Sequence, residues 1–488
     1  MILAGILLFV AAFVSLFLYY RLDAIGSSVR IHHSIPRSKI HVPFLGTIFG
    51  FIFHFDRLHD LLCEDINQPG IDTITYSLPF NPPFIMVNDP ASVEHITSGN
   101  FDNFVKGDFM SSKLFELFGN GIFNSDGKNW HFQRKVGSKI FTTNAFKKLF
   151  NTVFMDNIGS LLNILSSGSL SDQPIDIHDI FHRFFLDSFG KIAFGVNLEC
   201  LSMKEDPFAT SFDRSQRALV QRFFNPLWKL SDYLNPIHTR DIAFVRDVGY
   251  KMIQQRKNSQ KVYENDLLAL FMNYRTEDGV ELNDNQLVDQ VINFIIAGRD
   301  TTAQALSWTV YHLQKTPRVT IKLLEEMNSV MEPEQMIPTY EQVKTMKYAN
   351  AVFRESLRLR PSVPAELKVA VEDDVLPNGT IIQAGVVVGW LPYSMGRNES
   401  IWGSNACEFQ PERFLTGKTY SQYEYPVFNS GPRICLGKTL AELQGALVLT
   451  SILRQFKLEV ENVDKVTYAP SLTLPIKDGL FCKVSRRL

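Results

Sequence analysis

Apolar residues recur at intervals of three and four along most of the chain, which is the spacing of one face of an α-helix. On this basis helices are predicted over residues 129–151, 176–195, 208–223, 240–257, 284–313, 319–331 and 348–359. Shorter runs predict strands at 73–77 and 83–88 and a hairpin around 377–379. The chain is therefore expected to be mainly α with small β-sheets (α+β).

The first 20 residues form an apolar run without a charged side chain. At about 1.5 Å per residue, a helix of that length just crosses a hydrocarbon core of about 30 Å. No basic residue precedes the run, as one would in a cleaved signal peptide, so residues 1–20 are predicted to be a retained single-pass transmembrane anchor. Basic residues such as Arg21 and Arg30 follow it, which places the rest of the chain on the cytosolic side of a membrane that we expect to be the endoplasmic reticulum.

A polar segment over residues 21–44 follows the apolar run and contains Pro36 and Pro43. Proline and polar residues between two apolar regions are typical of a linker. No second linker, internal repeat or low-complexity tract follows. Residues 45–488 are therefore predicted to form one large domain.

Composition narrows the class of protein. The 49 lysines and arginines nearly balance the 51 aspartates and glutamates, giving a net charge of −2, so no nucleic-acid partner is expected. The 5 cysteines contain no CxxC pair, which argues against a disulfide framework or a zinc knuckle and favours a reducing environment.

One cysteine stands out by its surroundings. Cys435 lies in the Gly- and Pro-rich segment 428–437, immediately before an apolar helix that begins near Lys438. Backbone N–H groups at that helix start and the nearby Arg433 would stabilise a thiolate, which is either a metal ligand or a nucleophile. A buried structural cysteine is the plain alternative. A phosphate-binding loop is disfavoured, because the spacing of the two glycines is wrong and a proline lies between them.

The spacing Phe-x-x-Gly-x-Arg-x-Cys-x-Gly over 428–437 resembles the haem-binding loop of the cytochrome P-450 family at every fixed position. The resemblance implies that Cys435 is the axial ligand of a haem b iron and that Arg433 contacts a haem propionate. An axial thiolate donates electron density to iron and favours cleavage of the O–O bond. Ile296 stands where some animal members of the family carry a glutamate that esterifies haem, so the haem is expected to be bound non-covalently.

Two further motifs resemble those of the same family. Glu355 and Arg358 share one helical face, which alone indicates only a surface salt bridge worth less than about 1 kcal/mol. Followed by a Pro-Glu-Arg-Phe segment that holds Arg413, they resemble the family's Glu-Arg-Arg lock, which implies a structural role in holding the cysteine loop. Trp130 and Arg134 also share a helical face; a plain packing pair is the alternative, but the resemblance implies that both contact haem propionates.

The helix predicted over 284–313 carries Gly298, Asp300 and Thr301 near its middle. Glycine and threonine are poor helix formers, and threonine can bond back to a preceding carbonyl, so the helix is expected to be locally loosened there. A packing notch is the alternative explanation. The segment resembles the family's oxygen-activation motif, which implies that Thr301 positions dioxygen and that Asp300 helps to relay protons.

The resemblance implies a haem-thiolate monooxygenase domain that inserts one atom of O₂ into a C–H bond of a lipophilic substrate. Electrons would come from NADPH through a separate flavoprotein reductase, for which Lys128, Lys135, Lys139 and Lys438 are candidate docking residues. Segments 266–268, 359–364 and 373–380 resemble the plant-type fatty-acid ω-hydroxylases, so ω-hydroxylation of a fatty acid is expected.

Apolar segments are consistent with a lipophilic substrate. Phenylalanines cluster over 101–123, where the resemblance places the cover of the substrate pocket, and candidate walls lie at 222–224, 363–365 and 472–474. Three alternatives remain: a sterol or terpenoid hydroxylase of the same family, a haem-thiolate isomerase or dehydratase acting on lipid hydroperoxides, and a haem sensor or membrane scaffold. The presence of both Asp300 and Thr301 disfavours the second.

Overall fold

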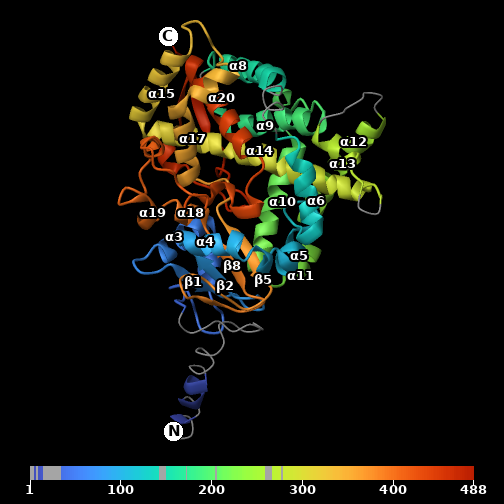
Figure 1. The fold of residues 1–488 in the computed structure, drawn as a ribbon, viewed down its shortest axis with the longest axis vertical. Coiled ribbons are helices and arrows are strands. Elements are labelled where there is room, and N and C mark those ends of the chain that lie inside the picture. Colours follow the sequence, from blue (N-terminus) through green and yellow to red (C-terminus); the bar gives the residue numbers. More distant parts are fainter. Residues whose placement is uncertain are drawn as a thin grey trace.

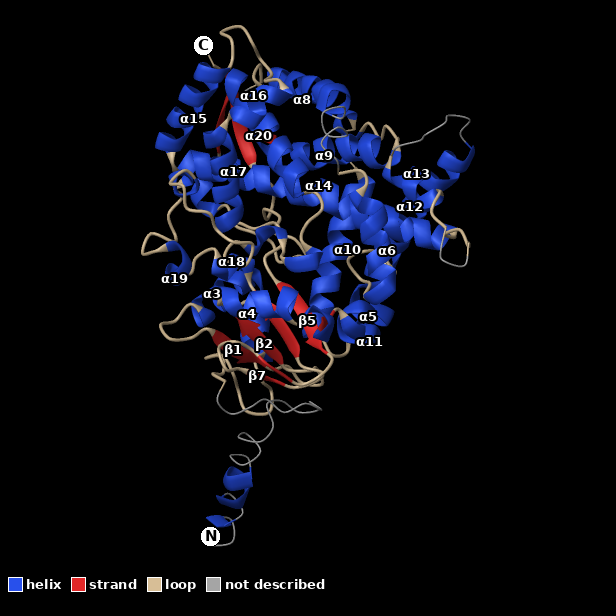
Figure 2. Ribbon diagram, viewed as in Figure 1, coloured by secondary structure: helices blue, strands red, loops and turns tan. Residues whose placement is uncertain are grey.

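The computed structural model describes residues 5–6, 9–14, 35–141, 150–171, 173–203, 206–258, 266–275 and 279–487. A long helix, α14 (Asp284–Lys315), crosses the centre of a largely helical body (Figure 1). A twisted sheet lies at one end of that body, and helices make up most of the remainder (Figure 2).

The described α-helices between residue 35 and α14 are α2 (Ile48–Phe53), α3 (Leu58–Ile66), α4 (Pro90–Glu94), α5 (Gly107–Phe118), α6 (Gly127–Ser138), α8 (Met155–Gly168), α9 (Ile177–Phe194), α10 (Pro207–Phe224), α11 (Trp228–Leu234), α12 (Ile237–Asn258) and α13 (Leu267–Met272). Those after it are α15 (Pro317–Val330), α16 (Tyr340–Thr345), α17 (Lys347–Leu359), α18 (Pro392–Met395), α19 (Glu399–Trp402) and α20 (Lys438–Gln455). The central helix α14 packs against α5, α9, α12, α17 and α20.

Local sequence explains where the central helices begin. The Asn283 side chain accepts a hydrogen bond from the N–H of Gln286, whose side chain accepts one from the N–H of Asn283, so α14 starts with a capping box. The Asp176 side chain caps α9 by accepting hydrogen bonds from backbone N–H groups of the first turn, and that helix ends at Gly195, which adopts a left-handed φ of 64°. These caps fix the first turns of the two helices that pack most closely together.

The strands of the described part of the chain form three sheets. The largest has the order β1-β2-β8-β5-β3, a smaller one has the order β4-β10-β9, and β6 pairs with β7. Their bounds are β1 (Thr73–Tyr76), β2 (Phe84–Val87), β3 (Phe104–Val105), β4 (Ile175–Asp176), β5 (Glu366–Ala370), β6 (Asp374–Val375), β7 (Ile381–Ile382), β8 (Val387–Trp390), β9 (Phe456–Val460) and β10 (Phe481–Arg486). In the largest sheet only the β2–β8 pair is parallel, with Phe84 opposite Val387.

Both faces of the largest sheet are buried, because successive side chains of a strand point to opposite faces. In β2, Phe84 and Met86 join one apolar cluster and Ile85 and Val87 join another. A third and much larger cluster surrounds α14. The sheet therefore packs against apolar side chains on each face rather than presenting one face to water.

The structure confirms the mainly helical class with small sheets, the two strands predicted near residues 73 and 83, and the hairpin around 377–379. The helix predicted over 129–151 is wrong in its extent, because α6 ends at Ser138 and residues 139–141 are not helical; residues 142–149 of the prediction lie outside the described residues. The last turn of α6 contains Gly137 and Ser138, which have low helix propensity. The prediction extended past Ser138 because it relied on apolar spacing alone, and that spacing continues beyond the end of α6.

The predicted transmembrane anchor over 1–20 is described only at residues 5–6 and 9–14, so most of it lies outside the described residues. The same holds for the predicted linker between residues 21 and 34. Across the ranges given above, no helix is both long enough and apolar enough to cross a membrane.

Candidate functional site

The loop that carries Cys435 is held against a distant part of the chain. The Cys435 N–H donates to the Phe428 carbonyl at 2.7 Å, which closes the loop just before α20. Gly431 has a φ of +61°, and a Cβ atom there would lie 2.0 Å from the Thr97 carbonyl oxygen. The Ser430 hydroxyl donates to the Thr97 hydroxyl at 3.0 Å. Only glycine combines this backbone conformation with so close an approach.

Opposing effects act on the pKa of the Cys435 thiol. The surrounding protein raises its pKa by desolvation, while the backbone N–H of Gly437 and the positive charges of Arg134 and Lys438 lower it. The backbone N–H groups of Gly437 and Lys438 both lower this pKa, and both lie at the start of α20, as expected for a sulfur at a helix N-terminus. A coordinating metal ion deprotonates a thiol outright, so these donors would then stabilise a thiolate.

The structure brings together the three residues predicted to contact haem propionates. Trp130 is buried in α6, and its ring lies 4.5 Å from the guanidinium carbon of Arg433 and 5.8 Å from that of Arg134. Burial lowers the pKa of both arginines. Arg433 also pairs with Asp126 at 2.6 Å. Asp126 accepts from the N–H groups of residues 106 and 107 at 3.0 Å each, which ties the start of α5 to this cluster.

Lys368 in β5 belongs to the same cluster and was missed by the sequence analysis. Its side chain is 3% exposed, and its Nζ has no hydrogen-bond partner among the described residues; the same is true of the Arg433 Nε. Desolvation lowers the pKa of Lys368 well below its ordinary value, and the charges of Lys106 and Arg433 add to this effect. The available signal was a lysine inside a buried strand, which is rare without a partner.

Whether the site suits a haem can be judged from its buried cationic atoms without a hydrogen-bond partner, the Lys368 Nζ and the Arg433 Nε. A buried ammonium without an acceptor is costly, and an anionic ligand would satisfy it. The two propionates of a haem would supply such acceptors beside a cysteine sulfur, so Lys368, Arg433, Arg134 and Cys435 fit that group. A haem bound there would supply the chemistry of oxygen activation.

Thr301 lies in the middle of α14, which is a continuous helix. Its hydroxyl donates to the Ala297 carbonyl at 2.7 Å, and its own carbonyl accepts from the Ser362 hydroxyl at 2.6 Å. A Cβ atom at Gly298 would lie 2.1 Å from the Phe189 ring of α9. The glycine is thus required for close helix packing, whereas the threonine is bonded back along the helix as expected from its residue type.

Asp300 is buried and charge-paired rather than directed at Thr301. It accepts from Arg299 at 2.6 Å and from the Gln216 amide at 2.7 Å, and Arg299 also pairs with Asp213 at 2.9 Å. Burial raises the pKa of Asp300 to about 6, against the opposing charge of Arg299. In the described part of the chain no hydrogen bond joins the Asp300 and Thr301 side chains. Gln216 lies on α10, eighty-four residues away in the sequence, so no local pattern could identify it.

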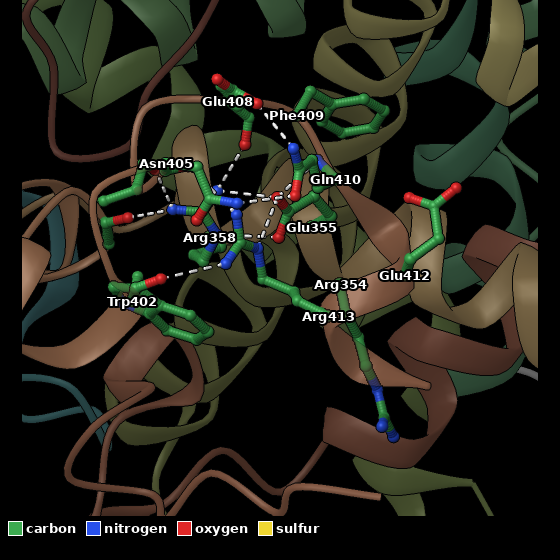
Figure 3. Close-up of polar contacts among 12 residues, drawn as sticks. Arg354, Glu355, Arg358, Trp402, Asn405, Glu408, Phe409, Gln410, Glu412 and Arg413 are labelled. Atoms are coloured by element: carbon green, nitrogen blue, oxygen red, sulfur yellow. Dashed lines mark hydrogen bonds and ion pairs between the residues drawn. The ribbon is translucent and has the colours of Figure 1, made fainter. Parts of the chain in front are cut away.

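Glu355, Arg358 and Arg413 meet in a buried cluster (Figure 3). The Glu355 carboxylate accepts two hydrogen bonds from Arg358, at 2.7 Å each, one from Arg413 at 3.0 Å, and one from the Gln410 N–H at 2.8 Å. Both members of the Glu355–Arg358 pair are 0% exposed. The pair is therefore buried and is not the surface salt bridge that the motif alone would indicate.

The arginines of this cluster bind the loop that leads toward the cysteine segment. Arg358 donates to the carbonyls of Gly396, Ala406 and Glu408, and Arg413 donates to those of Trp402 and Asn405. The Tyr425 hydroxyl, one residue before the turn at Pro426–Phe428, donates to the Arg354 carbonyl at 2.7 Å. The segment from residue 396 to the cysteine loop is thus fastened to α17.

A cysteine loop beside cationic side chains, two of which have buried nitrogen atoms without a hydrogen-bond partner among the described residues, suits a haem with a thiolate ligand. The cytochrome P450 family model matches residues 36–482, and the chain belongs to that family. The family resemblance stated from the motifs is confirmed.

Relatives with assigned names cover nearly the whole chain. Cytochrome P450 704B1 of Arabidopsis thaliana is 33% identical over 91% of this chain and 94% of its own length. Cytochrome P450 86B1 of the same plant is 36% identical over 91% and 85%, and cytochrome P450 94A2 of Vicia sativa is 34% identical over 93% and 91%. Membership establishes a monooxygenase with a haem-thiolate cofactor that receives electrons from a redox partner. The roles of individual residues remain predictions.

Proposed function

We propose that the chain hydroxylates a fatty acid at or near its terminal carbon. The observation that carries the proposal is the apolar packing where α5, α10, β2 and β5 meet: Phe109 of α5 contacts Phe84 of β2 and Phe223 of α10 at ring distances of 5.8 and 6.1 Å. Ala365 and Leu367 pack against the same apolar cluster. Apolar side chains of this kind suit contact with an aliphatic chain, since each buried methylene contributes about 0.8 kcal/mol. The resemblance of segments 359–364 and 373–380 to fatty-acid ω-hydroxylases points to the same substrate.

The proposed roles of the chain's residues follow from their positions. Cys435 would ligate the iron of a bound haem, and Trp130, Arg134, Arg433 and Lys368 would hold its propionates. Thr301 and Asp300 hold and move protons beside the reacting oxygen, and the buried carboxyl group of Asp300 exchanges protons near neutral pH because its pKa is about 6. The lock formed by Glu355, Arg358 and Arg413 positions the cysteine loop and takes no part in the chemistry.

Electrons come, in this proposal, from NADPH through a separate flavoprotein reductase. Lys128, Lys135 and Lys139 are exposed on α6 and the turn after it, and Lys438 starts the helix behind Cys435. Exposed lysines next to the thiolate loop suit an acidic partner, whose approach would be steered by charge.

We further propose that residues 1–20 anchor the 45–488 domain in the endoplasmic reticulum membrane, facing the cytosol. Support comes from exposed apolar side chains close to the start of the domain. Phe224, at the end of α10, packs on Phe51 and Phe55 at ring distances of 5.2 and 5.9 Å, so α2 and the segment after α10 are neighbours. Exposed apolar residues in these two regions and beside β1 are Val42, Leu45, Phe49, Ile52, Phe53, Phe80, Leu227, Leu230, Tyr233, Leu234 and Ile237. Large exposed apolar patches mark interaction sites, and a bilayer suits this one.

The test is a substrate screen with the purified protein, a reconstituted NADPH reductase and fatty acids of graded length. Terminal or near-terminal hydroxy acids formed only with NADPH and O₂ are the expected products. Hydroxylated sterols or terpenoids with no fatty-acid product would contradict the proposed substrate. Conversion of lipid hydroperoxides without NADPH or reductase would instead favour the isomerase or dehydratase class.

A further inference from the structure

Lys113 on α5 is a buried cation without an acidic partner. Its side chain is 6% exposed, and no carboxylate among the described residues lies within ion-pairing distance of its Nζ. Burial lowers the pKa of Lys113 to about 8, and the only charged group that adds to the shift is another cation, Lys229. The ammonium still carries its proton at neutral pH, so the fold holds an uncompensated positive charge at this place.

Aromatic rings surround that charge. The Lys113 Nζ lies 3.7 Å from the centroid of the Phe109 ring and 5.9 Å from that of Phe223. Such cation–π contacts partly replace hydration, but they leave the ammonium protons available to an anion. The exposed Lys229, on α11, adds a second positive charge on the solvent side.

Arg222, the neighbouring buried cation, differs from Lys113 because it has acidic partners. Arg222 is also buried, but it pairs with Glu116 at 2.5 Å and Asp232 at 2.7 Å. It donates to the Lys113 carbonyl at 3.0 Å, which fixes the backbone of α5 against α10. Acidic residues are therefore present nearby and neutralise the arginine, while the lysine beside it has none.

Lys113 lies beside the apolar surface proposed to bind the substrate chain. Phe109, one helical turn before it, contacts both Phe84 of β2 and Phe223 of α10. At the start of the same helix, a Cβ atom on Gly107 would lie 3.2 Å from Val369 of β5. The Lys113 ammonium thus lies at the edge of an apolar region that is bounded by α5, α10 and strands β2 and β5 of the largest sheet.

We propose that Lys113, with Lys229 behind it, binds the carboxylate of the fatty-acid substrate; this assignment rests on the proposed function. A fatty acid has one charged group, and a buried ammonium in an aromatic setting without an acid supplies the matching charge. Fixing the carboxylate at one end restricts which carbon can reach the iron, so Lys113 determines both affinity for the acid and the position of hydroxylation.

The experiment compares dodecanoic acid with its methyl ester, which has the same chain but no charge. Binding is followed by the shift of the haem Soret band in the full-length holoprotein, and products are identified by mass spectrometry. For the wild type we expect the acid to bind at least about tenfold more tightly than the ester. Lys113→Met should weaken binding of the acid by about tenfold or more and leave the ester unchanged. Lys113→Arg should restore binding of the acid.

Lys251→Met is the matched control, since Lys251 is exposed and, among the described residues, pairs only with Asp247 on the same helix. It should change binding of neither ligand. With Lys113→Met we also expect products spread toward internal carbons, which a general loss of stability would not cause. Equal effects of Lys113→Met on acid and ester, or no effect on either, would overturn the assignment.

Failure of this assignment can be told apart from failure of the proposed function. If the wild type hydroxylates fatty acids but Lys113→Met binds them normally, only the carboxylate site is wrong. If the wild type hydroxylates no fatty acid at all, the proposed function is wrong as well. Should the methionine variant not fold, the wild-type comparison still decides, because equal or tighter binding of the ester rejects a cationic site.

Discussion

Replacing Glu355 by glutamine tests how much the buried lock contributes to stability. The change keeps the size of the side chain but removes its charge, and it turns one acceptor oxygen into an N–H₂ group that faces donors. Glu355 accepts from Arg358 twice, from Arg413 and from the Gln410 N–H, so two buried guanidinium groups lose their counter-charge. The perturbation therefore leaves charge uncompensated at a site that water does not reach.

The expected magnitude follows from that burial. Removing one partner of a buried ion pair costs roughly 3–5 kcal/mol, whereas an exposed pair contributes less than about 1 kcal/mol. Domains are typically stable by about 5–15 kcal/mol, so the variant should lose a large fraction of its free energy of unfolding. Because Arg358 and Arg413 hold the segment before the cysteine loop, haem should be lost together with the fold.

The assay is urea unfolding of the purified holoprotein, followed by far-ultraviolet circular dichroism and by the Soret band. Asp247→Asn is the control, since it breaks the exposed Asp247–Lys251 pair. A loss for Glu355→Gln no larger than that of the control would refute the reasoning. So would full stability of the polypeptide combined with haem loss, because the lock would then act on the cofactor alone.

Four further outcomes are expected. Cys435→Ala should abolish the thiolate-type Soret band of the ferrous CO complex, and its retention would reject Cys435 as the ligand. Lys368→Met should release haem to apomyoglobin about tenfold faster or more, whereas Lys368→Arg should not, because the unpaired cationic group is the one that we propose binds the propionate. Thr301→Ala should raise peroxide release per NADPH consumed while substrate binding stays normal; unchanged coupling would remove Thr301 from proton delivery. For Asp300, the raised pKa of about 6 means that the folded state binds the proton more tightly than the unfolded chain, so stability relative to Asp300→Asn should fall as pH rises from about 4 to about 6, and a constant difference across that window would contradict the shift.

Local patterns sufficed for most of the architecture and for the residues that lie within motifs. The lock triad and the cluster of Trp130, Arg134 and Arg433 were found because each residue sits in a short, fixed spacing, and the structure then brings the members together. The end of α6 was missed because apolar spacing carries little information about where a helix stops.

The missed residues depend on contacts between distant segments. Lys368 differs from an ordinary strand lysine only by its burial, and Gln216 only by its contact with Asp300 on another helix. Asp126 precedes α6 and could have been taken for a helix cap, but its ion pair with Arg433 joins segments more than three hundred residues apart. No spacing in one sequence encodes such a pairing.

The contact between Gly431 and the Thr97 carbonyl has a consequence for adjusting the reactivity of the enzyme. The Thr97 hydroxyl donates a hydrogen bond to the Val93 carbonyl at 2.7 Å, so α4 and the short π-helix after it (His95–Gly99) support the loop that carries the sulfur. Mutagenesis aimed at the redox potential of the iron should therefore include residues 93–99 and not only 428–437. Small shifts of residues 93–99 would alter the hydrogen-bond donors around the Cys435 sulfur while leaving the sequence motif over 428–437 unchanged.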